Sequence, residues 1–212
     1  MNKFRIVSII LVLALMQSCS RSETQASKAP EPGKQESGVS TEVPETAEPK
    51  EIAVGDDLSE ILAGFQVKDS KNAIKNLSSV IGGKESLVIL VKPGCVFCES
   101  LLAVMSSQKT KSDPRMIIVM DGAHATPEEF QAKRKKNSTI KAQWVYDFAN
   151  KFHDELAMNS FPRLVHLDKK LNVIENQIGL RLPEDKASLE GLEFPVVLQK
   201  LSLNTVDWID SL

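Results

Sequence analysis

Two apolar runs, LVILV at residues 87–91 and MIIVM at residues 116–120, constrain the fold of this 212-residue chain most strongly. Because side chains alternate between the two faces of a strand, a run without a polar position indicates a strand that is buried on both faces. Such strands occur in parallel or mixed sheets that helices cover on each side. The sequence therefore predicts an α/β sandwich with a mixed central sheet.

Helical periodicity and capping signals predict the layers around this sheet. Apolar residues recur at helical spacing over residues 96–107, and Thr126 followed by Pro127 predicts the start of another helix. We also expect a terminal helix over about 195–209. Residues 163–167 and 172–178 are predicted to be two strands joined by a turn.

Two further segments are interpreted as helical. We expect a helix from about residue 144 to residue 156, with aromatic side chains divided between core and surface: Trp144, Tyr146 and Phe148. The cluster KRKK at 133–136 is interpreted as the solvated face of a helix. The formal net charge is only -2, so nothing indicates binding to nucleic acid.

Residues 1–18 have the pattern of a bacterial lipoprotein signal peptide. MNKFR carries two positive charges, and the largely apolar stretch that follows it is too short to span a bilayer comfortably. The stretch ends at QSCS, which resembles a lipobox, and this resemblance implies cleavage before Cys19 and attachment of lipid to its thiol. Met16 departs from the leucine that is more usual there. The alternatives are a plain signal peptide or an uncleaved anchor.

Residues 19–51 are predicted to be a disordered tether that begins at the lipidated Cys19. The segment has four prolines, no aromatic residue and many Ser, Thr, Glu and Lys residues, so it cannot bury enough apolar surface to offset chain ordering. As a coil its ends would lie roughly 30 Å apart. Residues 52–212 then form one domain by length. The expected location is the bacterial cell envelope, lipid-anchored and facing the periplasm, with the inner and outer membranes both open.

The motif KPGCVFC places Cys95 and Cys98 where strand 87–91 leads into helix 96–107. A c-type haem site needs histidine directly after the second cysteine, and that residue is Glu99. A disulfide between residues three apart closes too small a loop for a structural staple, and the pattern of a peroxiredoxin is absent. A structural zinc site needs four ligands, and the remaining candidates are singly spaced: His124, His153 and His166. Redox chemistry is left, with no cofactor and no metal.

The two thiols are expected to have different roles. Cys95 lies at the first turn of the predicted helix, where unpaired amides and the helix dipole favour a thiolate, so its pKa should fall below ~8.5. Lys92 adds to this effect if its amine reaches the sulfur. Cys98 lies one turn further on and should be less exposed. We therefore expect Cys95 to attack a substrate disulfide and Cys98 to resolve the mixed disulfide.

The order of strand, CxxC, helix and a distant proline before a hairpin resembles the thioredoxin superfamily. More narrowly, residues 54–180 resemble membrane-tethered, TlpA/ResA-like thiol–disulfide oxidoreductases, through VGDDLSEILAGFQVKDSKNAIKNLSSVIGGKESLVILVKPGCVFC and WVYDFANKFHDELAMNSFPRLVHLDKKLNVIENQIG. The resemblance implies a thioredoxin-like three-layer sandwich with an N-terminal hairpin extension. It also implies that Phe161 and Pro162 bind substrate, with Pro162 as a cis-proline that faces the cysteines.

The chain departs from that family at several positions around the cysteines. Gly94 stands where a tryptophan is common, and a different pair replaces the Gly-Pro often found between the cysteines: Val96 and Phe97. With Lys92, this pair is expected to tune the redox site. Ile89 stands where many members bury an acidic residue, so the proton of Cys98 must pass to another group or to water. Glu99 is one candidate, and the alternative is that it is an exposed acid in the first helical turn.

The predicted function is that of an envelope thiol–disulfide oxidoreductase, an enzyme that reduces disulfides of protein substrates. The reducing direction comes from the resemblance. The implied partners are a protein disulfide substrate, the membrane through the lipid anchor, and an unidentified redox donor. The alternative is a non-catalytic binding module such as a copper metallochaperone, with His166 as a third ligand, although those proteins have a three-residue gap between their cysteines.

Overall fold

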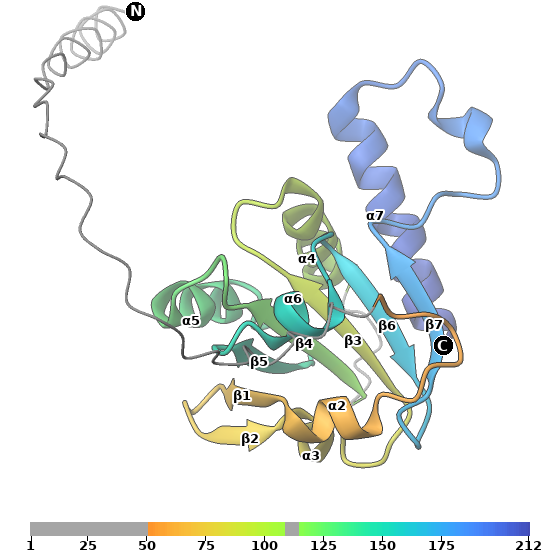
Figure 1. Cartoon of the computed structure of the whole chain (residues 1–212). Coiled ribbons are helices and arrows are strands. Elements are labelled where there is room, and N and C mark those ends of the chain that lie inside the picture. The colour runs from red at the N-terminus through yellow and green to blue at the C-terminus, as the bar shows by residue number, and fades with distance from the viewer. Residues whose placement is uncertain (1–50, 109–114) are drawn as a thin grey trace, which may run out of the picture. The chain divides into compact units, whose positions relative to one another are not determined.

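The computed structural model describes residues 51–108 and 115–212, which contain a seven-stranded mixed sheet with the order β2-β1-β5-β4-β3-β6-β7 (Figure 1). Its centre is formed by three parallel strands: β3 (Ser86–Val91), β4 (Met116–Asp121) and β5 (Gln143–Asp147). Next to β3, β6 (Arg163–Leu167) and β7 (Val173–Ile178) are antiparallel. Next to β5 lies an antiparallel hairpin, β1 (Gln66–Asp69) and β2 (Ile74–Asn76).

Helices cover both faces of the sheet. One face carries α4 (Val96–Gln108), α5 (Pro127–Lys136) and α7 (Phe194–Ser211), the last preceded by a 3-10 helix, Lys186–Leu189. The other face carries α2 (Ser59–Gly64), α3 (Leu77–Ile81) and α6 (Lys151–Leu156). The expected three-layer sandwich with an N-terminal hairpin is therefore confirmed.

The apolar run of β3 divides between the two cores as strand alternation requires. Ile89 and Val91 belong to the core beneath α4 and α7, whereas Val88 and Leu90 belong to the core beneath α2, α3 and α6. All six residues of β3 are buried, and so are all six of β4. The prediction of strands buried on both faces is confirmed.

Several predicted helix boundaries also agree with the structure. The helix expected over 96–107 is α4, and the terminal helix expected over 195–209 is α7. Thr126 caps α5 as expected: its hydroxyl accepts the N–H of Glu129 at 3.2 Å, and the Glu129 carboxylate accepts the N–H of Thr126 at 2.8 Å. Such a capping box satisfies two donors that a helix start leaves unpaired.

The helix expected over about 144–156 is wrong in its first half, because Gln143–Asp147 is strand β5. Trp144 and Tyr146 are buried in one core and Val145 in the other, which is the alternation of a strand; Phe148 after the strand is half-buried. The aromatic residues at 144, 148 and 152 have helical spacing, and this coincidence caused the error.

Asp147 and Asn150 determine how the chain passes from β5 into α6. Asn150 has a φ of 57°, a left-handed conformation that a continuous helix does not contain. The Asp147 carboxylate accepts the N–H groups of Lys151 at 3.1 Å and Phe152 at 3.0 Å, and so caps the start of α6. A strand, a left-handed turn and a short helix therefore replace the predicted single helix.

The predicted signal peptide, the lipidation site Cys19 and the tether up to residue 50 lie outside the described residues. Within the described ranges, none of the helices has both the length and the apolar character needed to cross a bilayer.

Gly122 lets the ends of β4 and β5 approach closely, and this contact yields a prediction about stability. A Cβ atom at position 122 would lie 1.9 Å from the carbonyl oxygen of Asp147, a backbone atom that cannot rotate away. Gly122→Ala should therefore lower the free energy of unfolding by about 2–3 kcal/mol. Gly64→Ala is the matched control, since a Cβ at the end of α2 meets nothing within 4 Å. Denaturant titration measures both, and an unchanged Gly122→Ala variant would contradict the close approach.

Candidate redox site

The two cysteines of the motif lie at the turn from β3 into α4 and form a disulfide, with their Cα atoms 5.2 Å apart. The turn consists of Lys92, Pro93 and Gly94. Gly94 has a φ of 69°, a conformation that glycine adopts without the steric cost of a side chain. This backbone geometry accounts for the glycine at position 94, where the family that the chain resembles commonly has tryptophan.

Cys95 occupies the N-cap position of α4. Its Sγ accepts the N–H of Cys98 at 3.1 Å, and its carbonyl accepts the N–H of Glu99 at 3.0 Å. A sulfur at this position faces unpaired amides and the positive end of the helix dipole, both of which stabilise a thiolate once the disulfide is reduced. Cys98 is fully buried, whereas Cys95 keeps 8% exposure. A partner can therefore reach the sulfur of Cys95 first.

The loop before β6 faces this disulfide. The Phe161–Pro162 peptide bond is cis, and the carbonyl oxygen of Phe161 lies 3.6 Å from Sγ of Cys95. This proximity follows from the sheet, because the first residue of β6, Arg163, pairs with Leu90 near the end of β3. The structure thus brings together the four residues that the sequence assigned to the centre of the site.

The residues predicted to tune the site lie on two sides of it. The Lys92 amine is 5.1 Å from the centre of the Phe161 ring, in a cation–π contact, so it is directed at the ring. Val96 and Phe97 are exposed, and the Phe97 ring meets that of Phe194, the first residue of α7, edge to face at 6.2 Å. An apolar surface therefore borders Cys95 on the side of α4 and α7.

Glu99, the sequence candidate for a proton acceptor, is already engaged. Its carboxylate contacts the amine of Lys133 and lies 3.6 Å from that of Lys136. The Glu99 carboxylate therefore already has two cationic partners on α5. The interpretation of residues 133–136 as a solvated face is wrong for Lys133: only 14% of its side chain is exposed, and burial lowers the pKa of its amine.

This arrangement predicts that Glu99 is not needed for disulfide exchange. Glu99→Gln keeps the size of the side chain and removes the charge that pairs with Lys133 and Lys136. We expect the rate of exchange between the reduced protein and a polypeptide disulfide to change less than about threefold. The reason is that Glu99 would then influence the cysteines only through screened electrostatic interactions. Stopped-flow measurements would show it, and a tenfold loss in a folded variant would restore Glu99 as the proton acceptor.

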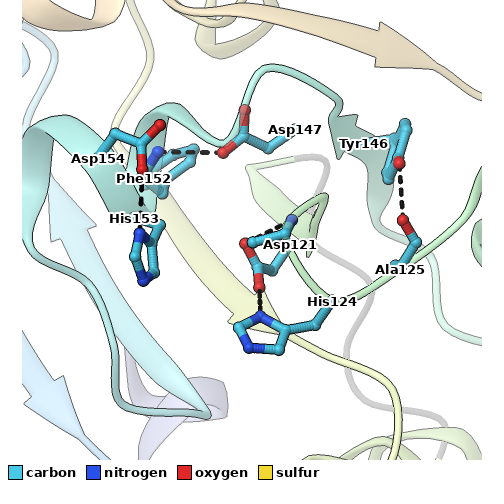
Figure 2. A network of polar contacts seen from close by, with 9 residues as sticks. Asp121, His124, Ala125, Tyr146, Asp147, Phe152, His153 and Asp154 are labelled. Carbon is cyan, nitrogen blue, oxygen red and sulfur yellow. Dashed lines mark hydrogen bonds and ion pairs between the residues drawn. The ribbon is translucent and has the colours of Figure 1, made fainter. Parts of the chain in front are cut away.

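The sequence analysis missed a buried acid that is linked to the redox site through His124 and Phe161. Asp121 ends β4, its side chain is 1% exposed, and its carboxylate is hydrogen-bonded to Nδ1 of His124 (Figure 2). The His124 ring packs edge to face against the ring of Phe161, with centroids 6.1 Å apart. A signal was available in the sequence, since DGAH directly follows the run MIIVM. Polar residues after parallel strands gather at one edge of a sheet, where binding crevices form.

A second acid lies next to Asp121 in the strand register. Asp147 is fully buried at the end of β5, and burial raises the pKa of its carboxyl. The N–H groups of Phe152 and Lys151 partly offset that rise, and the charge of Asp121 adds to it. Figure 2 shows Asp147 with Phe152 and, nearby, the Tyr146 hydroxyl that donates to the carbonyl of Ala125 at 2.8 Å. Asp147 therefore serves to cap α6.

The structure does not bring His166 to the cysteines. His166 pairs with Leu87 at the start of β3, whereas Cys95 follows the end of that strand, and its Nε2 lies 3.0 Å from the Glu85 carboxylate. Leu87 and the last residue of β3, Val91, are four residues apart along the strand, which corresponds to about 13 Å. Among the described residues, no three His, Cys, Asp or Glu side chains are grouped so that they could hold a metal ion.

Comparison with known proteins finds likeness in structure only. No protein-family model and no curated protein matches the chain. The solved structures that match include the thioredoxin domain of a thiol-disulfide oxidoreductase and a secreted disulfide oxidoreductase. The sheet order, the helices on both faces and the CxxC at the start of α4 agree with the thioredoxin-like sandwich that the sequence predicts.

Three of these structures illustrate the extent of the likeness. The thioredoxin domain of a thiol-disulfide oxidoreductase from Bacteroides vulgatus is 17% identical; the match covers 66% of this chain and 96% of that one, with a TM-score of 0.47. StoA from Bacillus subtilis is 16% identical over 59% and 92%, with a TM-score of 0.44. The exposed lipoprotein thioredoxin Etrx1 from Streptococcus pneumoniae is 15% identical over 66% and 98%, with a TM-score of 0.45. Residue roles are therefore inferred from this chain's own geometry.

Proposed function

We propose that this chain is an envelope thiol–disulfide oxidoreductase that reduces disulfides of polypeptide substrates through Cys95 and Cys98. The observation that carries the proposal is the asymmetry of the pair. The Cys95 sulfur sits at the N-cap of α4, where it accepts the N–H of Cys98 and keeps some exposure, while Cys98 is fully buried. One sulfur is thus suited to attack and the other to resolution.

The proposed reaction begins with the reduced protein. The Cys95 thiolate attacks one sulfur of the substrate disulfide, the other substrate sulfur leaves as a thiolate, and a mixed disulfide forms. Cys98 then attacks the Cys95 sulfur, which releases the second substrate thiol and forms the Cys95–Cys98 disulfide. A dithiol donor returns the pair to its reduced form. The backbone of Phe161, beside Cys95, is the proposed contact for an extended substrate segment.

The resemblance of residues 54–180 to TlpA/ResA-like proteins supports the reducing direction. A measured reduction potential of the Cys95–Cys98 pair tests it directly. A potential near that of thioredoxin, about -270 mV, fits a reductase, whereas one near about -120 mV fits an oxidant of substrate thiols.

Cysteine variants test the roles of the two thiols. Cys95→Ser should lower the rate of reduction of a polypeptide disulfide such as that of insulin by at least about 100-fold, because no accessible thiolate remains. Cys98→Ser should instead accumulate a mixed disulfide between Cys95 and the substrate, which mass spectrometry detects. Accumulation of the mixed disulfide on Cys98 in the Cys95→Ser variant would reverse the assignment.

We further propose that residues 1–18 are removed and that Cys19 carries lipid. Residues 19–51 would then tether the domain of residues 52–212 to a membrane, with the domain in the periplasm. The apolar stretch that ends at QSCS supports this proposal. In a bacterial host, the wild-type chain should incorporate a labelled fatty acid and partition into detergent, and Cys19→Ser should do neither. Failure of the wild type to take up label would exclude the lipid anchor.

A further inference from the structure

All three histidines of the chain pair with a carboxylate, but the pairs differ in burial and in position. The partner of His124 is buried, with 1% of the Asp121 side chain exposed, whereas the partner of His153 is 62% exposed. Figure 2 shows both pairs, with each imidazole directed at its own aspartate. His124 also contacts the ring of Phe161, whose carbonyl lies next to the sulfur of Cys95.

We propose that Asp121 and His124 form the acid–base pair of the exchange reaction, in which His124 holds the proton that the Cys95 thiol releases. This inference rests on the proposed function. An ionised carboxylate only accepts hydrogen bonds, so Asp121 fixes Nδ1 of His124 as a donor and leaves Nε2 as the nitrogen that exchanges protons. The His124 side chain is 44% exposed, so solvent and substrate can reach it.

The reaction requires such a pair because the other candidates near the cysteines do not supply it. Ile89 is an apolar residue at the strand position where the resembling family buries an acid. The Glu99 carboxylate is held by two lysines of α5, and the Lys92 amine lies over the Phe161 ring. His124 is the imidazole that packs against the residue touching Cys95.

The protons and electrons balance through His124. In the reduced protein, Cys95 is a thiolate and His124 an imidazolium that holds the proton from Cys95. Attack on the substrate disulfide releases one thiolate, which takes this proton. Neutral His124 then accepts the proton of Cys98 as that sulfur attacks Cys95, and passes it to the second leaving thiolate. The substrate gains two electrons and two protons, and a dithiol reductant restores the pair.

Charged groups from several elements surround this pair. They include Lys92 from the turn after β3 and Asp147 from β5. Burial raises the pKa of Tyr146, whose hydroxyl donates to the carbonyl of Ala125, the residue after His124. The charges of Glu128 and Glu129, in the first turn of α5, add to that rise. The charged groups around His124 are therefore mainly acidic.

Substitution of His124 tests the proposal with a readout that a structural role would not produce. The experiment follows reduction of insulin by the protein with dithiothreitol as the donor, from pH 5 to pH 9. His124→Ala should slow the reaction at neutral pH by about 10-fold or more, lose one inflection of the pH–rate profile, and regain rate when free imidazole is added. Asp121→Asn should retain part of the rate with an altered pH profile.

His153→Ala is the matched control, since it removes an imidazole of similar exposure from a pair with an exposed aspartate. It should keep the wild-type rate and pH profile. A His124→Ala variant that keeps both would overturn the inference, as would a folded variant whose lost rate imidazole does not restore. These outcomes differ from failure of the proposed function, in which the wild-type chain itself does not reduce insulin.

Discussion

The parallel pairing of β3, β4 and β5 determines where chemistry can occur in this chain. In the register of the sheet, Val91 lies beside Met120, and Asp121 lies beside Asp147, so the three strands end at a common edge. The strands themselves are buried on both faces and have no room for exposed polar groups. Each turn that leaves this edge can carry them. The disulfide, the Asp121–His124 pair and the cap of α6 are therefore neighbours although they are far apart in the chain.

The helix that begins at Cys95 makes the two sulfurs unequal. The sulfur of Cys95 takes the place of an oxygen at the N-cap, where amides face it, and the same helical turn carries Cys98 into the core. A buried thiol behaves as a small apolar group and ionises at a cost, so in the proposed reaction Cys98 needs a base to accept its proton. The proposed division of roles and the need for a base thus come from one geometric feature.

The sequence predicts the elements whose local pattern agrees with their burial. It does not predict contacts between residues that only the order of the strands brings together. The runs at 87–91 and 116–120, the CxxC at the helix start and the Thr126 cap all follow from local chemistry, and the structure contains each of them. Residues 143–147 form a strand although the aromatic residues at 144, 148 and 152 recur at helical spacing. The placement of His124 against Phe161 depends on β4 lying next to β3, which no local pattern states.

Under the proposed mechanism, the position of Asp121 allows this chain to do without a carboxylate beneath the disulfide. A lone carboxylate at Ile89 would lie in a fully apolar core and would be costly to ionise. Asp121 is equally buried, yet it has the imidazole of His124 and the N–H of Ala123, at 3.4 Å, as partners. Because the His124 side chain is partly exposed, the proposed proton exchange takes place at its Nε2 and not at the buried carboxylate. The core beneath the disulfide can then remain apolar while the proton is handled at its rim.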